Sequence, residues 1–179
     1  MHNEKEFNER LYELADKKFS LRIEGIVDYY VQHYEELVYD FIAIIEQLQS
    51  AKVKENSKYL FFHYLHSSTL MKNYRIKICL YNEKLYMDEE AASNWWRPPY
   101  IYDFIENDVK LFEKELKREF VGIKPWQMEE FRIKYANQFI AVLGFMLQMI
   151  FQDERLVDAL KRFEIAPFFG EFMGKAIKL

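Results

Sequence analysis

The stretch that decides the fold is Tyr135–Gln152, with the sequence YANQFIAVLGFMLQMIFQ, which contains no charged residue. A transmembrane helix needs about 20 predominantly apolar residues, so this stretch is slightly too short, and Asn137, Gln138 and Gln148 interrupt it. No basic cluster flanks it on one side. We therefore expect a helix from Pro125 to about residue 152 that forms the interior spine of the protein. A membrane span, or a helix shared between the core and a dimer interface, is a weaker alternative.

The composition around this stretch fits one soluble domain. The chain has 179 residues, a formal net charge of −4 and a sequence pI of about 5.7. This balance argues against a nucleic-acid-coating protein and predicts no general attraction to anionic membranes. Aromatic residues make up 18% of the chain, whereas there are only five glycines and four prolines. So few turn-forming residues predict long elements and argue against an all-β sandwich.

Helical periodicity dominates the first third of the chain. A short amphipathic helix is expected over residues 4–17, and Ser20 is then expected to cap a long helix that extends to about Gln49. An apolar seam with alternating steps of four and three supports the long helix. Its members are Val27, Val31, Tyr34, Val38, Phe41, Ile45 and Leu48. Residues 51–57 are polar and predict a loop.

The middle of the chain changes its period. Residues 58–72 carry aromatic side chains in almost every direction, which we interpret as a deeply buried helix. Tyr74, Ile76, Ile78 and Leu80 then alternate with other residues, as in a strand with one buried face. Residues 84–88 are expected to return as a second strand. The prediction is a small hairpin over about residues 74–88, packed against helices because an isolated hairpin is marginal in water.

The last part of the chain is expected to be helical again. A loop over residues 88–99 leads to a helix that Pro99 opens and Gly122 ends, and a final helix covers about residues 153–163. The tail, residues 165–179, is too apolar to stay free and should dock. The predicted fold is therefore mainly α: an irregular bundle of five to six helices with a small two-stranded β-hairpin packed against it, in a single domain over residues 1–179.

Few motifs in the sequence point to catalysis. The phosphate-binding loop, the dinucleotide-binding glycine pattern, the H-E-x-x-H zinc motif and the G-x-S-x-G nucleophile elbow are all missing. Cys79 is the only cysteine, which excludes an intramolecular disulfide and a cysteine metal cluster. The N-terminal residues are polar and acidic, without an apolar segment behind them, so a cytoplasmic location is expected. We predict no catalytic residue and no cofactor.

Three histidines provide the only candidate metal site. His63 and His66 are three residues apart on the expected helix, and His33 lies midway along the long helix with Glu36 one turn later. Helical bundles build metal sites from such residues on facing helices. The alternative, which we favour, is that His63 and His66 form hydrogen bonds inside an aromatic helix.

The most suggestive segment is Asn94–Tyr100, with the sequence NWWRPPY. Tryptophan, arginine and tyrosine dominate interaction hot spots, and two prolines would hold the segment rigid. Trp95, Trp96, Arg97 and Tyr100 are therefore predicted to bind a partner or ligand. The alternative is that the tryptophans fix the loop to the bundle.

Three functions follow from these observations. The leading hypothesis is a non-catalytic binding or regulatory module that uses an aromatic surface or groove near residues 95–100. The second is a helical bundle that senses a small apolar or cationic molecule in an aromatic pocket. The third is a metal-dependent enzyme at a cluster of His33, His63 and His66. The expected partner is a protein or such a small molecule, with a homodimer left open, and not a nucleic acid or a membrane.

Overall fold

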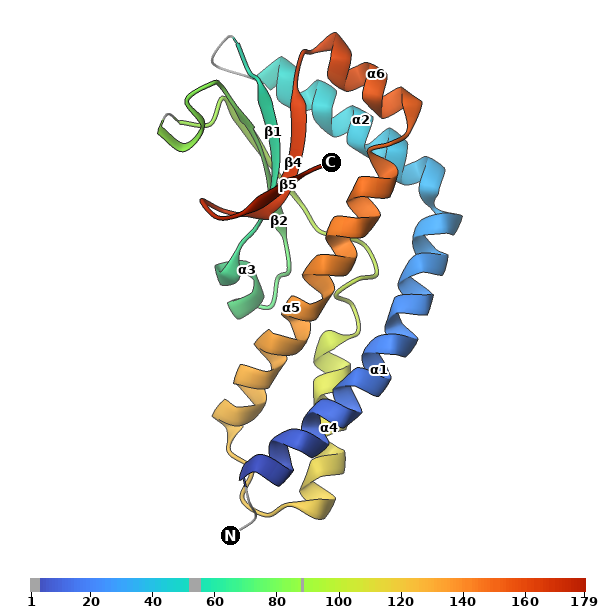
Figure 1. Cartoon of the computed structure of the whole chain (residues 1–179), viewed down its shortest axis with the longest axis vertical. Coiled ribbons are helices and arrows are strands. Elements are labelled where there is room, and N and C mark those ends of the chain that lie inside the picture. The colour runs from blue at the N-terminus through green and yellow to red at the C-terminus, as the bar shows by residue number, and fades with distance from the viewer. Residues whose placement is uncertain (1–3, 52–55, 88) are drawn as a thin grey trace. The chain divides into compact units, whose positions relative to one another are not determined.

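The structure is a computed structural model that describes residues 4–51, 56–87 and 89–179. Its elements, in chain order, are α1 (Glu4–Gln32), α2 (Tyr34–Ala51), β1 (Tyr59–Tyr64), α3 (His66–Leu70), β2 (Ile76–Tyr81), the 3-10 turn η1 (Leu85–Met87), β3 (Ala92–Trp96), α4 (Ile105–Glu119), α5 (Pro125–Ile150), α6 (Glu154–Arg162), β4 (Ala166–Glu171) and β5 (Ala176–Lys178) (Figure 1). The chain divides into two compact units. Unit 1 comprises Met1–Tyr29 and Pro99–Val142, and unit 2 comprises Tyr30–Pro98 and Leu143–Leu179.

Unit 1 is a helical assembly of most of α1, all of α4 and the first part of α5. Its core consists of aromatic rings that meet edge to face. Phe7 of α1 contacts Phe120 with ring centroids 5.5 Å apart, and Phe112 of α4 contacts Tyr135 of α5 at 5.4 Å. Helical spacing places these rings on one stripe of each helix, so burying the stripes holds the three helices together.

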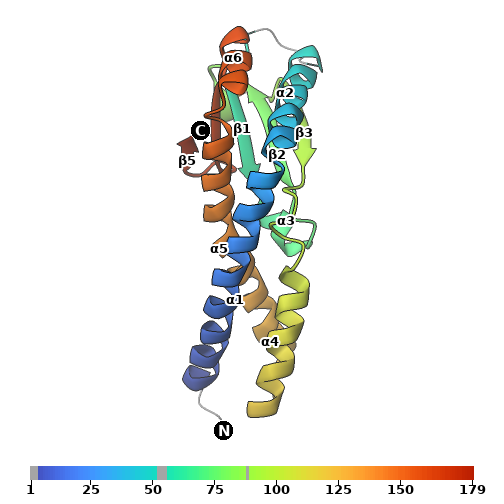
Figure 2. The same cartoon turned by 90° about the vertical axis from the view of Figure 1, so that its right-hand side faces the viewer.

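Unit 2 combines a five-stranded sheet with α2, α6 and the end of α5. The strand order is β3-β2-β1-β4-β5, and only the β1–β4 pair is parallel. Strand alternation gives the sheet two faces. The face that carries Leu60, Phe62 and Tyr64 of β1 is called the helix face, because Phe62 contacts Phe41 of α2 at 5.6 Å and Phe151 at 5.2 Å. Figure 2 shows α2 and α6 on this side of the sheet.

The opposite face carries Tyr59, Phe61 and His63 of β1 and is called the aromatic face. The register of the β1–β2 pair places Lys77, Cys79 and Tyr81 of β2 on the aromatic face as well. Phe61 stacks on Phe168 of β4 with ring centroids 5.0 Å apart. The 3-10 turn η1 and the turn between β4 and β5 add Tyr86 and Phe172, whose rings are 5.5 Å apart. The two faces of the sheet are thus buried in different ways, by helices on one and by strand and turn aromatics on the other.

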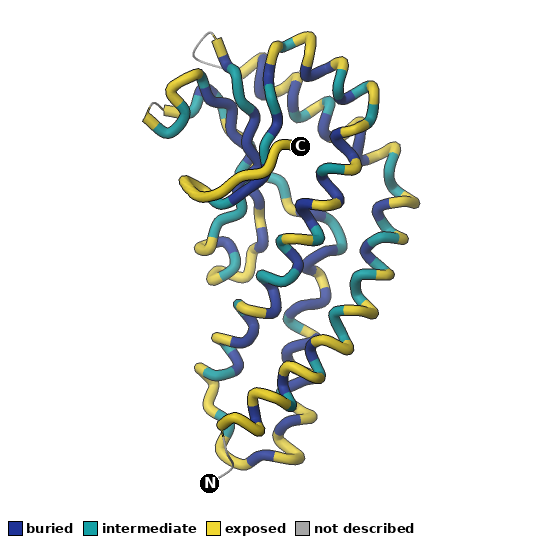
Figure 3. The backbone as a smooth tube through the Cα atoms, viewed as in Figure 1, coloured by how far each residue is buried: buried dark blue, intermediate teal, exposed yellow. Residues whose placement is uncertain are grey.

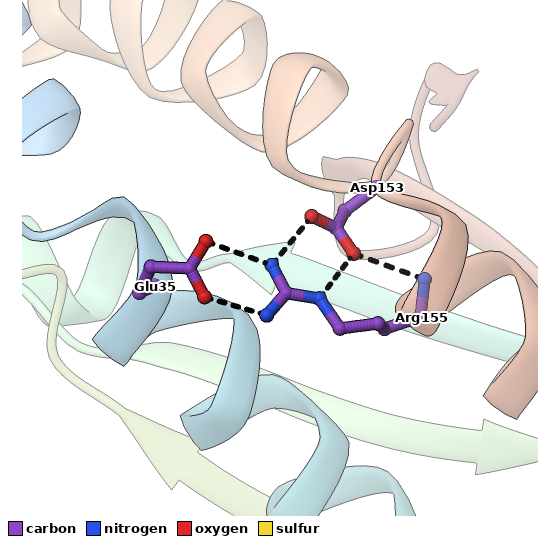
Figure 4. Close-up of polar contacts among 3 residues, drawn as sticks. All are labelled: Glu35, Asp153 and Arg155. Atoms are coloured by element: carbon purple, nitrogen blue, oxygen red, sulfur yellow. Dashed lines mark hydrogen bonds and ion pairs between the residues drawn. The ribbon is translucent and has the colours of Figure 1, made fainter.

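An arginine ties α6 to α2 within unit 2 (Figure 4). The Arg155 guanidinium donates to both carboxylate oxygens of Glu35, at 2.5 and 3.2 Å, and to both oxygens of Asp153, at 2.9 and 2.8 Å. Asp153 also caps α6, since its Oδ1 accepts the backbone N–H of Arg155. These hydrogen bonds from Arg155 lower the pKa of Asp153 to about 2. The helix predicted over about residues 153–163 is confirmed as α6, whose capping residue the sequence analysis did not name.

The fold class expected from sequence is wrong. Six α-helices are present in the described residues, but the predicted two-stranded hairpin is part of a five-stranded mixed sheet. The structure is a helix-dominated α/β fold. Whether the whole chain is a single domain stays a prediction.

Three elements account for this error. The expected helix over residues 58–72 is strand β1 followed by the short helix α3, because a continuous aromatic run fits a doubly buried strand as well as a helix. The strand β2 is confirmed, but its expected partner at residues 84–88 contains the 3-10 turn η1, and residue 88 lies outside the described residues. Strand β3 pairs with β2 instead, where we expected a loop. The tail forms β4 and β5.

The helix boundaries in the first third also differ. Helix α1 continues through Ser20, whose hydroxyl donates to the backbone carbonyl of Asp16 instead of capping a new helix. The helix is interrupted at His33, which separates α1 from α2. The predicted apolar seam is therefore buried from Val38 onwards, whereas Val31 is exposed. Residues 52–55 of the expected loop lie outside the described residues.

The uncharged stretch lies on α5, as expected. Its buried residues recur at helical spacing along the helix, with exposed positions such as Phe145 between them (Figure 3). Among the described residues, α5 is the one helix that is long and apolar enough to cross a membrane by length and composition, a test that the core helix of a soluble protein also meets. A core position stays our expectation for this helix.

Candidate functional site

The two adjacent tryptophans of the NWWRPPY segment lie on strand β3, at one edge of the sheet. Trp96 pairs in register with Ile76 on the helix face, and its ring is 4.9 Å from that of Phe41 on α2. Trp95 points to the aromatic face and is 50% exposed. Strand alternation therefore separates two residues that look equivalent in the sequence: Trp96 anchors the strand to the helices, and Trp95 is presented to solvent.

Asn94 fixes the edge strand locally. Its side-chain amide donates to Oε1 of Gln47 on α2 at 3.2 Å, and its Oδ1 accepts the backbone N–H of Trp95 at 2.7 Å. An edge strand usually presents unpaired amides that template pairing with another chain. Here the amide of Trp95 already has an acceptor, so the side chain is more available to a partner than the backbone.

The other two predicted binding residues differ in their surroundings. Arg97 follows Trp95 by two residues and is exposed. Tyr100 belongs to unit 1, where its ring stacks on Tyr29 with centroids 5.0 Å apart and an interplanar angle of 3°. Its backbone N–H donates to Asp103 at 3.2 Å. We therefore place Tyr100 with the packing of unit 1, and Trp95 and Arg97 with the exposed surface of unit 2.

A paired charge lies directly beside Trp95. Lys77 is the cross-strand neighbour of Trp95, and its ammonium makes a hydrogen-bonded ion pair with Glu90. Burial acts to raise the pKa of Glu90, but the hydrogen bond and the attraction from Lys77 outweigh it and leave this pKa below its ordinary value. Glu90 is therefore ionised at neutral pH, and the Lys77 ammonium balances its charge. The charges of Lys77 and Glu90 beside Trp95 therefore offset each other.

The next residue in this cross-strand row is His63, opposite Lys77 on β1. His63 is fully buried, and neither ring nitrogen has a hydrogen-bond partner among the described residues. Aromatic rings surround the imidazole: Phe61 stacks on it at 5.0 Å, and Phe172 meets it edge-on at 5.3 Å. Burial, followed by repulsion from Lys77, lowers the pKa of His63 to about 4. The imidazole is therefore neutral at physiological pH.

Cys79 shares the aromatic face with His63 but is not poised as a nucleophile. The thiol is fully buried, and its sulfur lies 3.8 Å from Oε2 of Glu90. Burial and the nearby Glu90 charge raise the pKa of this thiol to about 12. Since the thiolate is the reactive form, Cys79 has the character of a packed core residue at neutral pH.

The histidines do not form the metal cluster that the sequence left open. His33 lies at the break between α1 and α2, with its Nδ1 2.9 Å from Glu36. His66 on α3 lies 2.8 Å from Glu171 of β4 through its Nε2. Within residues 4–51, 56–87 and 89–179, no three His, Cys, Asp or Glu side chains come together as a metal would require. The metal hypothesis therefore gains no geometric support.

The sequence analysis missed a polar cluster inside unit 1. Asp108 of α4 is fully buried and accepts two hydrogen bonds from Arg22 of α1, at 2.9 and 2.7 Å, and one from the Tyr135 hydroxyl at 3.1 Å. One signal was available: Asp108 lies three residues after Ile105 and four before Phe112, within the apolar stripe of its helix. A charged residue at such a position needs a buried partner.

Comparison with known proteins adds no relative. No protein-family model matches the chain, and no curated protein and no solved structure matches it either.

Proposed function

We propose that the protein is a non-catalytic binding module that receives a protein partner at the exposed side of strand β3, with Trp95 as the main contact and Arg97 beside it. The observation that carries this proposal is that the two tryptophans have different surroundings. Trp96 already anchors the strand, so the half-exposed Trp95 is not needed to attach β3 to unit 2. Tryptophan and arginine are among the residue types enriched in the hot spots of protein interfaces.

The chemistry of this surface indicates the kind of partner. Trp95 offers a flat apolar area, and Arg97 is an exposed cation whose planar guanidinium suits a carboxylate. Lys77 and Glu90 neutralise each other, so they add no strong preference of their own. We therefore expect a peptide segment in which an apolar or aromatic residue is close to an acidic one.

The test begins with a random peptide library selected against the full chain. The affinities of the selected peptides are then measured for the parent protein and for Trp95→Ala, which should weaken binding by at least about tenfold because hot-spot truncations cost about 2 kcal/mol or more. Arg97→Gln should weaken only the peptides that contain an acidic residue.

Trp126→Ala is the matched control. Trp126 is 59% exposed, as a residue of unit 1, so its replacement removes a comparable aromatic area elsewhere. Selected peptides that lose affinity for Trp126→Ala and not for Trp95→Ala would show that the proposed surface is wrong.

A further inference from the structure

A pocket of about 560 Å³ lies within unit 2, where β1 and β4 begin and close to the end of α6. It is a depression that is largely open to solvent, and its volume falls in the range of roughly 300–1,000 Å³ of small-molecule sites. The described residues that line it include Lys58, Phe151, Leu160, Lys161, Pro167 and Lys178. This pocket is separate from the Trp95 surface, whose residues do not line it.

The inner part of the pocket is apolar. Phe151, Leu160 and Ile165 are buried, and the half-buried Val157 adds a fourth aliphatic or aromatic side chain from the same region. Pro167 of β4 lacks a backbone N–H group, so it presents only hydrocarbon and a carbonyl. Such a lining favours an alkyl chain or a similar apolar group by the ordinary burial of apolar surface.

The outer part is cationic. Lys58, Lys161 and Lys178 contribute three ammonium groups, against one carboxylate side chain, Glu164, in the described lining. This local excess contrasts with the net charge of −4 for the whole chain.

The lysines are not held firmly by other partners. Lys58 lies 3.8 Å from Glu83, and Lys161 lies 3.9 Å from Asp158. Exposed ion pairs of this length contribute little to stability, so both ammonium groups can turn toward a bound anion at little cost. Within the described part of the chain, no carboxylate pairs with the ammonium of Lys178.

We propose that this pocket binds an amphipathic anion: an apolar chain with a single carboxylate or phosphate head group. The chain lies against Phe151, Leu160 and Pro167, and the head group meets the three lysines at the rim. This ligand class differs from the apolar or cationic molecule expected from sequence, because the lysines repel a cation. The site extends the proposed function and does not depend on it.

Calorimetric titration of the full chain with decanoate and with decyl phosphate tests the proposal and separates the two head groups. Decyltrimethylammonium, inorganic phosphate and acetate are the comparison probes. We expect one or both decyl anions to bind with saturation, and the three comparison probes to bind at least about tenfold more weakly. Equal binding of decyltrimethylammonium, or no saturable binding of either decyl anion, would overturn the proposal.

Surface substitutions locate the site. The double variant Lys161→Gln/Lys178→Gln should weaken decyl-anion binding by about fivefold to twentyfold, while Lys175→Gln, an exposed lysine outside the lining, should change it less than about twofold. Amide NMR signals of Val157 and Ala166 should shift on titration. Shifts confined to other elements, or equal losses in both variants, would contradict the assignment. Trp95→Ala should retain decyl-anion binding, so failure of one proposal is distinguishable from failure of the other.

Discussion

His63 shows how a single residue depends on its surroundings. The ring has the stacking contacts of an aromatic core residue, with Phe61 on one side and Phe172 at its edge. Its two nitrogens lie within this apolar group without a hydrogen-bond partner among the described residues. The folded protein therefore stabilises the neutral imidazole relative to the protonated form.

This arrangement predicts a loss of stability in acid. The pKa of His63 is about 4 in the folded protein, against an ordinary value of 6.5. As the pH falls below about 6.5, the unfolded chain takes up a proton at this position and the folded chain does not. Stability is therefore lost between about pH 6.5 and pH 4, by up to about 3 kcal/mol from this residue. Urea unfolding of the parent protein and of His63→Phe across this range measures the contribution, since the variant should lack it.

His66→Gln serves as the matched control, because His66 is a histidine of the same unit that lies at the surface. The control should keep the acid-dependent loss that His63→Phe removes. Parallel stability curves for the parent and His63→Phe would show that the imidazole is not held neutral.

At the scale of elements, helices α4, α5 and α6 and strand β2 were predictable, whereas the rest of the sheet was not. The amphipathic stripes of α4, α5 and α6 recur every three to four residues, so their existence and approximate bounds follow from sequence. Strand β1, YLFFHY, has no such pattern, because both of its faces are buried. Its pairing with β4 joins residues about a hundred positions apart, and periodicity contains no information on such a contact.

The same limit applies to the candidate site. Composition drew attention to the segment that contains Trp95 and Trp96, but it gave no sign of the strand that directs one ring toward the helix face and the other toward the aromatic face. The alternation became visible only once β2 was known to pair with this segment. The cationic pocket was not predictable, since Lys58, Lys161 and Lys178 are widely separated in the chain and line one pocket only in the folded unit.

The N-terminus of α6 gives a prediction for an element. Asp153→Ala removes the capping acceptor of the helix and one of the two carboxylates bound to Arg155. We expect a loss of about 1–2 kcal/mol in the free energy of unfolding, measured by urea denaturation. The control Asp158→Ala changes an aspartate of the same helix whose side chain is 75% exposed, and it should cost less than about 0.5 kcal/mol. Equal effects of the two variants would argue against the cap.

At the scale of the whole molecule, the two units have cores of different character. Unit 2 contains a continuous aromatic and aliphatic core on both faces of its sheet. Unit 1 encloses a charge, Asp108, within its helical core. The bidentate bond from Arg22 fixes the relative register of α1 and α4, which apolar stripes alone would specify less sharply.

Asp108→Asn tests this contribution. The neutral asparagine amide cannot accept both hydrogen bonds in the way that the carboxylate does. The Arg22 guanidinium therefore loses its counter-ion in a partly buried site. We expect the free energy of unfolding to fall by about 2–3 kcal/mol, below the 3–5 kcal/mol of a fully buried pair because Arg22 retains some solvent contact. Asp16→Asn, at an exposed position of α1, should have little effect in the same denaturation experiment.

The central claim of this account is that strand β3 packs Trp96 against α2 and presents Trp95 to solvent. Acrylamide quenching of two single-tryptophan variants measures this most directly: Trp96→Phe/Trp126→Phe retains Trp95, and Trp95→Phe/Trp126→Phe retains Trp96. We predict strong quenching of the first variant and weak quenching of the second. Equal quenching, or stronger quenching of Trp96, would contradict the claim and remove the basis for the proposed binding surface.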